Sequence, residues 1–377
     1  MSRGIVPDPA TARQLLVRAI APSEAVKFAN EIASALETEL RDQGPALARR
    51  EASGWRDAER AARLLARDDV DYLLIAARGS SDNAARYGQY LLGLETGLTA
   101  ALAAPWLYGH GHQPPGLSRA AVLAISQSGR SPDVVGVLAA ARAQRRPTIA
   151  LTNSIGAPLA EQADVVVDLA VGPERSVAAT KTYTASLHAL AQIASAMVPD
   201  RISRESVREL PAQLEAAVAD QLRGRQRYDV LARARPLTVV GRGLDYATAH
   251  ETALKVRELS GVPSEGFSLP DLLHGPVAAL DRDAALWMTS SGSHAEAEVV
   301  EAFAELRSRA GVTVAVSGDP RLLELVDLPV RIPGDLAEWA GPVIAVVPGQ
   351  VAGLRLAEIG RRDIDRPFGL AKVTLTR

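Results

Sequence analysis

The stretch HETALKVRELSG, residues 250–261, carries an acid, a base and a second acid at Glu251, Lys255 and Glu258. Spacings of four and three residues place these side chains on one face of a helix. A carboxylate beside an ammonium group can take up and return a proton, which is the work of a general acid–base catalyst. The same spacing also fits a solvated ladder of salt bridges, and that alternative stays open at this point.

A serine-rich loop, residues 126–131 (SQSGRS), lies between an apolar run and a helix that begins at Pro132. Backbone N–H groups and hydroxyls at the start of a helix suit an anion such as phosphate, here without a lysine. A second such loop, residues 78–82 (RGSSD), follows the preceding apolar run. Ligands of open α/β sheets bind at the carboxyl ends of the strands, so the two loops are expected to converge on one site. The alternative is that both loops are ordinary helix caps and turns.

Further candidate residues lie at two other points in the chain. Lys181 stands in the first turn of a predicted helix, where a positive charge opposes the helix dipole, and an ion pair would explain its presence. Its neighbours Thr180 and Thr182 are expected to cap that helix. His274 lies in the loop LLHGP; an imidazole titrates near neutrality and suits acid–base chemistry, although a lone histidine is more often structural.

These residues must be positioned by a repeating pattern of elements. From Asp71 onward, short apolar runs bounded by Gly, Ser and Pro alternate with Ala-rich helical stretches, which predicts an α/β fold with a parallel sheet and crossover helices. The succession recurs later in the chain: LTVVGRG aligns with LLIAARG, TVAVSG with TIALTN, and VDLPVRI with ADVVVDL. We therefore interpret the chain as an internal duplication. At the positions equivalent to the charged triad the first copy has Tyr87, Leu91 and Leu94, so the charged face belongs to one copy and indicates a specific task.

Helical periodicity over residues 12–66 predicts a helical lead-in, and the region from about Pro199 to Arg235 has no strand signals and predicts a helical connection. The expected organisation is a helical lead-in at 1–66, a first domain at 67–205, a helical connection at 206–235, a second domain at 236–355 and a C-terminal tail at 356–377.

Composition excludes several classes of function. The 42 basic and 44 acidic residues are scattered, for a formal net charge of -2, so no basic stripe offers itself to nucleic acid or to an anionic membrane. The chain has no cysteine, which excludes disulfides, thiolate metal sites and cysteine nucleophiles. A helix needs about 18 to 20 apolar residues to span a bilayer, and no stretch of the chain is expected to come near that length. The N-terminus lacks a signal-peptide pattern. Cytoplasmic localisation is the expectation.

Six motifs then carry a resemblance to a known family. In order they are RGSSDNA, ISQSGRSPD, SVAATKTY, ALKVRELSG, LLHGPVA and DRPFGLAKVTLT. This ordered set resembles that of the tandem SIS-domain (sugar isomerase) family, and the match runs from about Ala76 to the end of the chain. The chain is similar to the isomerase half of glucosamine-6-phosphate synthase and to SIS-type glucosamine-6-phosphate deaminases. The resemblance implies two flavodoxin-like SIS domains, each a parallel sheet flanked by helices.

The resemblance also implies a role for each candidate residue. Glu258 would shuttle a proton between C1 and C2 of the sugar, with Lys255 and Glu251 beside it. His274 would assist ring opening from the second subunit of a homodimer, and the tail would cover the pocket with Lys372 as a further catalytic residue. The substrate-binding and phosphate-binding residues would be Ser80, Ser81, Ser126, Gln127, Ser128, Ser131, Val177 and Ala371.

The implied substrate is a hexosamine 6-phosphate. A carboxylate placed across C1 and C2 of an open-chain 2-amino aldose can move the proton and leave a C2 imine, which water hydrolyses to a ketose phosphate and ammonia. This chemistry needs no metal, nucleotide or redox cofactor. A synthase requires a cysteine glutaminase, so the absence of cysteine favours deamination of glucosamine 6-phosphate. No nucleic-acid or membrane partner is expected.

Two alternatives remain. One is an enzyme for another sugar phosphate: a galactosamine 6-phosphate deaminase, a fructosamine 6-phosphate deglycase or a plain aldose–ketose isomerase. The other is a sensor that binds a sugar phosphate without turnover and regulates a partner. A sensor could dispense with Glu258, His274 and Lys372, and all three are present.

Overall fold

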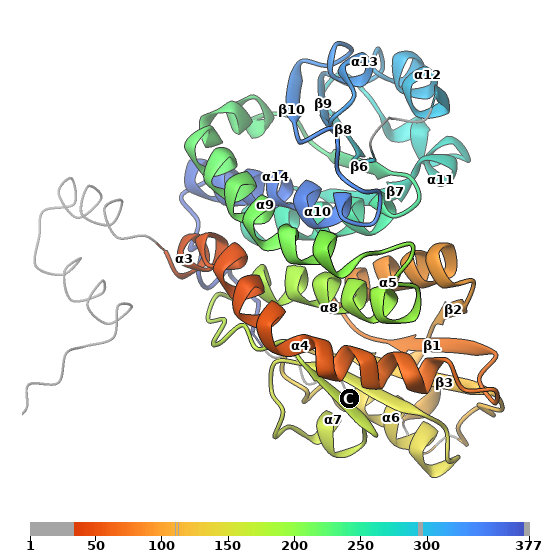
Figure 1. The fold of residues 1–377 in the computed structure, drawn as a ribbon. Coiled ribbons are helices and arrows are strands. Elements are labelled where there is room, and N and C mark those ends of the chain that lie inside the picture. The colour runs from red at the N-terminus through yellow and green to blue at the C-terminus, as the bar shows by residue number, and fades with distance from the viewer. Residues whose placement is uncertain (1–33, 110, 112, 293–296, 373–377) are drawn as a thin grey trace, which may run out of the picture.

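The computed structural model describes residues 34–109, 111, 113–292 and 297–372; the predicted lead-in before Ser34 and the tail beyond Lys372 lie outside the described residues. Two five-stranded sheets, one in each half of the chain, form the framework (Figure 1). Most of the long helices form layers between the two sheets, and shorter helices cover the outer faces.

The first sheet has the strand order β2-β1-β3-β4-β5, and every neighbouring pair is parallel. A parallel sheet covered on both faces needs apolar side chains in both directions, and all of β3 is buried for this reason. The strands are β1 (Tyr72–Ala76), β2 (Thr99–Leu102), β3 (Ala120–Ile125), β4 (Thr148–Thr152) and β5 (Val165–Asp168).

Successive side chains of these strands point to opposite faces of the sheet and pack against two separate layers of helices. Leu73 and Ile75 pack in the core that contains α4, α5 and α8, whereas Leu74 and Val122 pack with α6 and α7 on the other face. The helices of this half are α3 (Ala35–Arg41), α4 (Gln43–Leu65), α5 (Ser80–Thr96), η1 (Pro105–Tyr108), α6 (Pro132–Ala143), α7 (Pro158–Glu161) and α8 (Lys181–Met197).

The second sheet repeats the first, with all pairs parallel and the order β10-β9-β8-β6-β7. Its strands are β6 (Leu237–Gly241), β7 (Ser264–Ser268), β8 (Ala285–Ser290), β9 (Val312–Ser317) and β10 (Leu328–Arg331). Its helices are α10 (Asp245–Ser260), α11 (Leu269–Leu273), η3 (Pro276–Ala279), α12 (Ala297–Leu306), α13 (Pro320–Leu323) and α14 (Gly341–Ile359).

The repeated order confirms the predicted fold class and the internal duplication, because both sheets have the 2-1-3-4-5 arrangement of flavodoxin-like domains. The segment between the sheets is helical, as expected, with α9 (Arg204–Arg223) and η2 (Arg225–Ala232). Helix α14 continues to Ile359, beyond the expected start of the tail at residue 356. The exact domain boundaries remain a prediction.

Buried polar contacts join the two halves. The hydroxyl of Tyr87 in α5 donates a hydrogen bond of 2.7 Å to the backbone oxygen of Trp339. The amide of Gln43 in α4 donates one of 2.9 Å to the side-chain oxygen of Gln350 in α14. One hydrophobic cluster also includes side chains from both sheets and from the helices between them, so the halves share a core.

One expectation about apolar stretches is wrong. Helix α14 is long and apolar enough, by length and composition, to cross a membrane. It is instead 83% buried inside the protein over its most apolar window, because it lies between the second sheet and the helices of the first half (Figure 1). Its composition is that of a core helix, which is buried on all sides.

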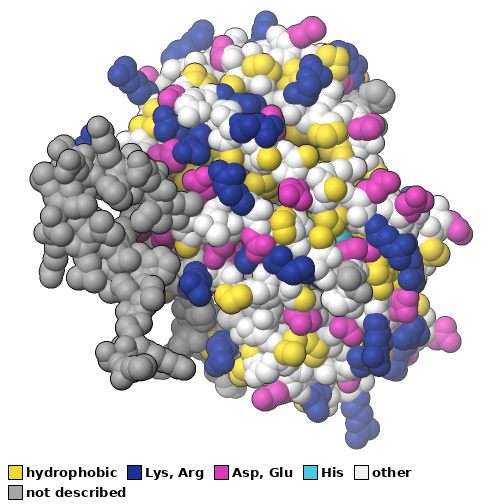
Figure 2. Space-filling model, turned by 60° about the vertical axis from the view of Figure 1, so that its left-hand side comes forward, with side chains coloured by type: hydrophobic (Ala, Val, Ile, Leu, Met, Phe, Trp, Pro, Cys, Tyr) yellow, Lys and Arg dark blue, Asp and Glu magenta, His cyan; other side chains and the backbone are white. Residues whose placement is uncertain are grey.

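The molecular surface agrees with the scattered charges of the sequence. Figure 2 shows basic and acidic side chains interspersed over one face, with small apolar areas between them. No continuous field of one sign is visible on the part of this face that is described.

Candidate functional site

Helix α10 brings Glu251, Lys255 and Glu258 together, as the sequence spacing predicted. The Lys255 ammonium contacts the Glu258 carboxylate and lies 3.5 Å from Oε1 of Glu251. The side chains of Glu251 and Lys255 are fully buried, while that of Glu258 is 24% exposed. The solvated salt-bridge ladder is therefore excluded, and only Glu258 can meet a ligand.

Burial gives this cluster unusual electrostatics. It raises the pKa of Glu251 to about 7, against the attraction of Lys255 and a hydrogen bond from Asn83. Burial alone would lower the pKa of Lys255, but the carboxylates of Glu251 and Glu258 outweigh it and raise that pKa. Lys255 is thus a fixed positive charge behind Glu258, and Glu251 can exchange a proton near neutral pH.

Residues of the first half complete the surroundings of Glu251. Asn83 in α5 donates a hydrogen bond of 2.8 Å to its Oε2 atom, and Ser80 at the start of α5 also interacts with the carboxylate. Oε1 of Glu251 has no hydrogen-bond partner within the described part of the chain. The acid–base helix of one domain therefore meets the loop 78–82 of the other.

The serine-rich loop 126–131 connects β3 to α6, as predicted. Oγ of Ser126 accepts a hydrogen bond of 3.2 Å from the backbone of Gly129, and Oγ of Ser128 accepts one of 3.3 Å from Arg130. Ser131 is the N-cap residue of α6, yet its side chain makes no capping hydrogen bond. Gly129 has φ of +63° and its α-carbon faces Ala157, so a side chain there would strain the turn. The first turn of α6 offers few donors, because Pro132 has no N–H and the N–H of Val134 donates a hydrogen bond of 2.9 Å to Oδ1 of Asp133.

Arg78 links the two serine loops. Its Nε atom lies 2.7 Å from Oδ2 of Asp133 in the first turn of α6, while its side chain is 48% exposed. The sequence pattern predicted the loop 78–82 but no role for this arginine. Its guanidinium is a positive charge next to the lysine-free anion loop. Ser81 lies beside Ser80 in the first turn of α5, which places both candidate serines at the same strand end.

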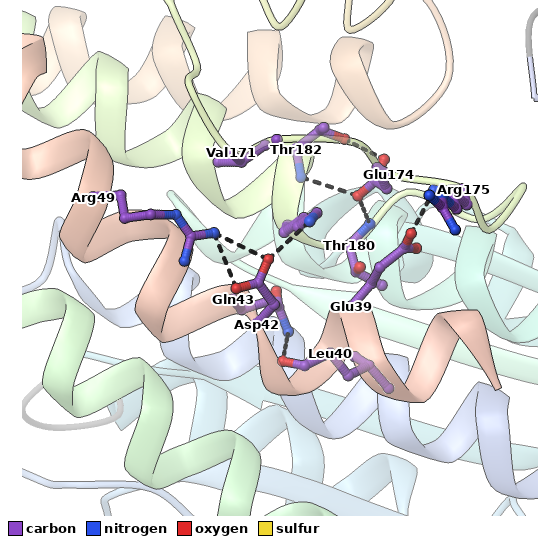
Figure 3. A network of polar contacts seen from close by, with 12 residues as sticks. Glu39, Leu40, Asp42, Gln43, Arg49, Val171, Glu174, Arg175, Thr180 and Thr182 are labelled. Carbon is purple, nitrogen blue, oxygen red and sulfur yellow. Dashed lines mark hydrogen bonds and ion pairs between the residues drawn. The ribbon is translucent and has the colours of Figure 1, made fainter. Parts of the chain in front are cut away.

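The prediction that Thr180 and Thr182 cap helix α8 is wrong. Thr180 occupies the N-cap position, but its side chain makes no capping hydrogen bond and its hydroxyl has no partner among the described residues. The carboxylate of Glu174 takes this role instead, accepting from the backbone of Thr180 at 2.9 Å and of Thr182 at 3.1 Å. Glu174 brings a full negative charge to the positive end of the helix dipole, which a hydroxyl cannot do. Figure 3 shows Glu174 beside the start of this helix, joined by dashed lines to Thr180 and Thr182.

Lys181 makes the ion pair that its position suggested. Its ammonium lies 2.8 Å from Oδ2 of Asp42, which also receives two hydrogen bonds from Arg49 (Figure 3). Asp42 lies between α3 and α4, so this pair fastens the start of α8 to the lead-in helices. We assign Lys181 a structural role.

The C-terminal tail returns to the first domain. Both carboxylate oxygens of Asp365 accept hydrogen bonds from the first turn of α3, at 3.1 Å from Ala35 and 3.0 Å from Leu36. Its backbone oxygen accepts one of 3.2 Å from Val177. The ammonium of Lys372 lies 2.6 Å from Oε2 of Glu174. The structure therefore brings Lys372, with Ala371 before it, to the loop that carries Val177.

His274 is not part of the cluster within one chain. It is the C-cap residue of α11, its side chain is exposed, and the recorded contacts of its backbone lie within α11. His250 lies next to Glu251 in the sequence, but its ring packs edge-on against the ring of Tyr246, with 4.6 Å between the ring centroids. Burial lowers the pKa of His250 to about 4, so this residue is neutral near pH 7.

One signal in the sequence could have drawn attention to the missed ion pair between Lys372 and Glu174. The chain has 42 basic residues, and only four of them are lysines: Lys27, Lys181, Lys255 and Lys372. The last three each contact a carboxylate in or near the candidate site. Lysine has a compact charge that arginine does not replace, so its scarcity marks the positions where it occurs.

The fold and the candidate site define a two-domain α/β protein with serine-rich anion loops in one domain and an acid–ammonium cluster in the other. The chain belongs to the SIS domain family, whose sequence model matches residues 69–196 and 230–321. This match confirms the resemblance that the six motifs carried.

Curated relatives align with most of this chain. The isomerizing glutamine–fructose-6-phosphate aminotransferase of Gloeobacter violaceus is 31% identical over 324 residues, covering 81% of this chain and 52% of the relative. The chain thus spans about half the length of the curated relatives it matches.

Two solved structures have the same fold. Glucosamine-6-phosphate deaminase from Thermotoga maritima has a TM-score of 0.73 at 20% identity and covers 91% of this chain and 100% of its own. Tagatose-6-phosphate ketose/aldose isomerase from Escherichia coli has a TM-score of 0.77 at 18% identity and covers 88% of this chain and 95% of its own. At these identities the likeness shows the fold alone.

Proposed function

We propose that this protein deaminates and isomerises an amino-sugar phosphate, converting glucosamine 6-phosphate to fructose 6-phosphate and ammonia. The observation that carries the proposal is the setting of Glu258. Its carboxylate is 24% exposed and touches the fully buried ammonium of Lys255. A base held in this way presents one side to a substrate and keeps a fixed positive charge on the other.

The phosphate would bind to the loop 126–131. Ser126, Gln127, Ser128 and Ser131 are the proposed ligands, and they lie before the start of α6, whose dipole favours an anion. Ser80, Ser81 and the backbone at Val177 would contact the sugar. Because Ser80 also interacts with Glu251, a sugar held by α5 would extend toward the acid–base cluster.

The proposed chemistry is a proton transfer followed by hydrolysis. Glu258 would take the proton from C2 of the open-chain amino aldose, leaving an enediol-type anion whose charge Lys255 stabilises, and return it to C1. The product is a C2 imine. Water adds to C2, the C–N bond breaks with its electron pair on nitrogen, and ammonia leaves. Lys372 would bind the substrate from the tail, and His274 of a second copy in a homodimer would assist ring opening.

The names of related proteins support the same class of substrate. Both names contain a hexose 6-phosphate: fructose 6-phosphate in glutamine–fructose-6-phosphate aminotransferase and glucosamine 6-phosphate in glucosamine-6-phosphate deaminase. This chain has no cysteine, so it lacks the nucleophile of a cysteine glutaminase, and we favour deamination over synthesis. We also propose a cytoplasmic location, which cell fractionation would test.

A plain aldose–ketose isomerase is the second candidate, because the Glu258–Lys255 arrangement suits proton transfer whether or not nitrogen is lost. The deciding experiment measures ammonia and fructose 6-phosphate released from glucosamine 6-phosphate, with galactosamine 6-phosphate, fructosamine 6-phosphate and glucose 6-phosphate in parallel. Ammonia from the gluco amino sugar supports the proposal. Turnover of glucose 6-phosphate alone would favour the isomerase. Binding of any of these compounds without turnover would favour a sensor.

A further inference from the structure

Glu174 is a fully buried carboxylate with an unusual set of partners. Its Oε1 atom accepts the two backbone hydrogen bonds that cap α8. Its Oε2 atom accepts a hydrogen bond of 2.7 Å from the hydroxyl of Thr182 and contacts the ammonium of Lys372 at 2.6 Å. Lys372 is therefore the ion-pair partner of a carboxylate that has no access to water.

The charge on buried Glu174 depends on its ion pair with Lys372. Burial would raise the pKa of Glu174, but the charge and hydrogen bond of Lys372, together with the hydrogen bonds from Thr180 and Thr182, outweigh it and lower that pKa. Without Lys372 the carboxylate would be buried with hydrogen bonds but without a counter-ion, which is costly. Glu39 of α3 lies close by and adds a second negative charge that interacts with Lys372.

Hydrogen bonds of Asp365 also join the tail to α3 and to the loop 171–180. Asp365 binds the first turn of α3 through its side chain and Val177 through its backbone oxygen. Val177 is three residues from Glu174. The tail therefore meets the loop 171–180 at two points, one a backbone hydrogen bond and the other a charged pair.

We propose that Glu174 is a positioning residue that holds the tail's Lys372 in place over the candidate site before any substrate binds. Glu174 itself does not touch the reacting atoms. It caps α8 with one oxygen and orients the Lys372 ammonium with the other, so that the ammonium is already directed when a sugar phosphate arrives. The kinetic consequence rests on the proposed function, but the contact itself does not.

A labelling experiment tests the contact without a substrate. Amines of the ligand-free protein are acetylated for short times, and the rate at each lysine is read by mass spectrometry. In Glu174→Gln the amide oxygen can still cap α8, but the ion pair is lost. Labelling of Lys372 is expected to rise several-fold, because its ammonium no longer has to leave a buried carboxylate before it reacts. Lys181, paired with Asp42, is the internal reference and keeps its rate.

Thr182→Val is the matched control. It removes a neutral hydrogen bond to the same Oε2 atom and leaves the Lys372 pair in place. Labelling of Lys372 is expected to stay near the wild-type rate. Equal labelling in wild type and Glu174→Gln would overturn the proposal, and so would an equal rise in Thr182→Val, which would assign the effect to loop packing.

Kinetics then separate positioning from general stability. Misplacing a substrate-binding group costs about 10-fold to 100-fold in rate, so Glu174→Gln should lower kcat by that factor while KM changes little. In a Lys372→Met background the same substitution should add no further loss, because Glu174 acts through Lys372. An equal loss in both backgrounds would contradict this. If wild type turns over no sugar phosphate, the proposed function fails while the labelling result still decides the role of Glu174.

Discussion

The side-chain amide of Asn83 donates a hydrogen bond of 2.8 Å to Oε2 of Glu251. These residues belong to α5 and α10, the two helices that follow the first strand of each repeat. Both side chains are buried. The duplication has therefore placed corresponding helices against each other, with the acid of one copy oriented by an amide of the other.

Asn83→Ala should destabilise the protein by about 1 to 3 kcal/mol, because it leaves a buried carboxylate oxygen without its donor. Urea denaturation measures the loss. Gln89→Ala on the same helix removes a partly buried hydrogen bond to Ala100 and is the matched control. If the Asn83 variant loses no more stability than this control, the interdomain contact contributes little.

Glu258→Gln should lower kcat by about 100-fold to 10,000-fold, because the amide keeps the size of the side chain and cannot accept the C2 proton. Substrate affinity should change little, which calorimetry with a slow substrate can measure. The exposed Glu265→Gln serves as a control. Full activity in Glu258→Gln would remove this residue from the mechanism.

Ser128→Ala combined with Ser131→Ala should weaken binding of phosphorylated sugars by about 10-fold or more per hydroxyl, because each would lose a hydrogen bond to a charged group. Binding of the same sugars without phosphate should be unaffected. Thermal shift titrations with both ligand types distinguish these cases. Equal weakening for both would contradict a phosphate site at this loop.

Glu251→Gln should change how stability depends on pH. Burial raises the pKa of Glu251 from 4.5 to about 7, so the folded protein holds this proton more tightly than the unfolded chain. The contribution of Glu251 to the free energy of unfolding is then fully present below about pH 4.5 and is lost as the pH rises through about 7. The variant, which cannot titrate there, should lack this decline. Melting temperatures recorded across that window, with Glu265→Gln as reference, provide the test; parallel curves for all three proteins would contradict it.

Asp365→Ala should cost about 0.5 to 2 kcal/mol, the usual effect of removing a helix N-cap, because two amides of α3 lose their acceptor. Asp365→Asn keeps one side-chain oxygen and should lose less. Chemical denaturation compares the two variants. Equal stability of Asp365→Ala and wild type would show that the tail does not support α3.

The strands and the duplication were predictable because parallel strands covered on both faces must be apolar along their length. The sequence AVLAIS shows this pattern, and β3 occupies that segment. Helix α14 was not recognised as a candidate membrane-spanning stretch, because Gln350, Arg355 and Glu358 interrupt its run of apolar residues.

The acid–base cluster was predictable because Glu251, Lys255 and Glu258 are near one another in sequence. Their burial was not, since it depends on α5 and α14. Glu174 was missed for a related reason: its partners Thr180 and Lys372 are 6 and 198 residues away, and only the folded chain brings all three together. The capping prediction for Thr180 failed because a nearby carboxylate competes better for the same amides.

The buried bonds from Tyr87 to Trp339, from Gln43 to Gln350 and from Asn83 to Glu251 all cross between the two sheets. A hinge that separated the sheets would break every one of them and hydrate the core they share. The two sheets are therefore expected to move as one rigid body. Ligands are therefore expected to reach the candidate site without separation of the two sheets.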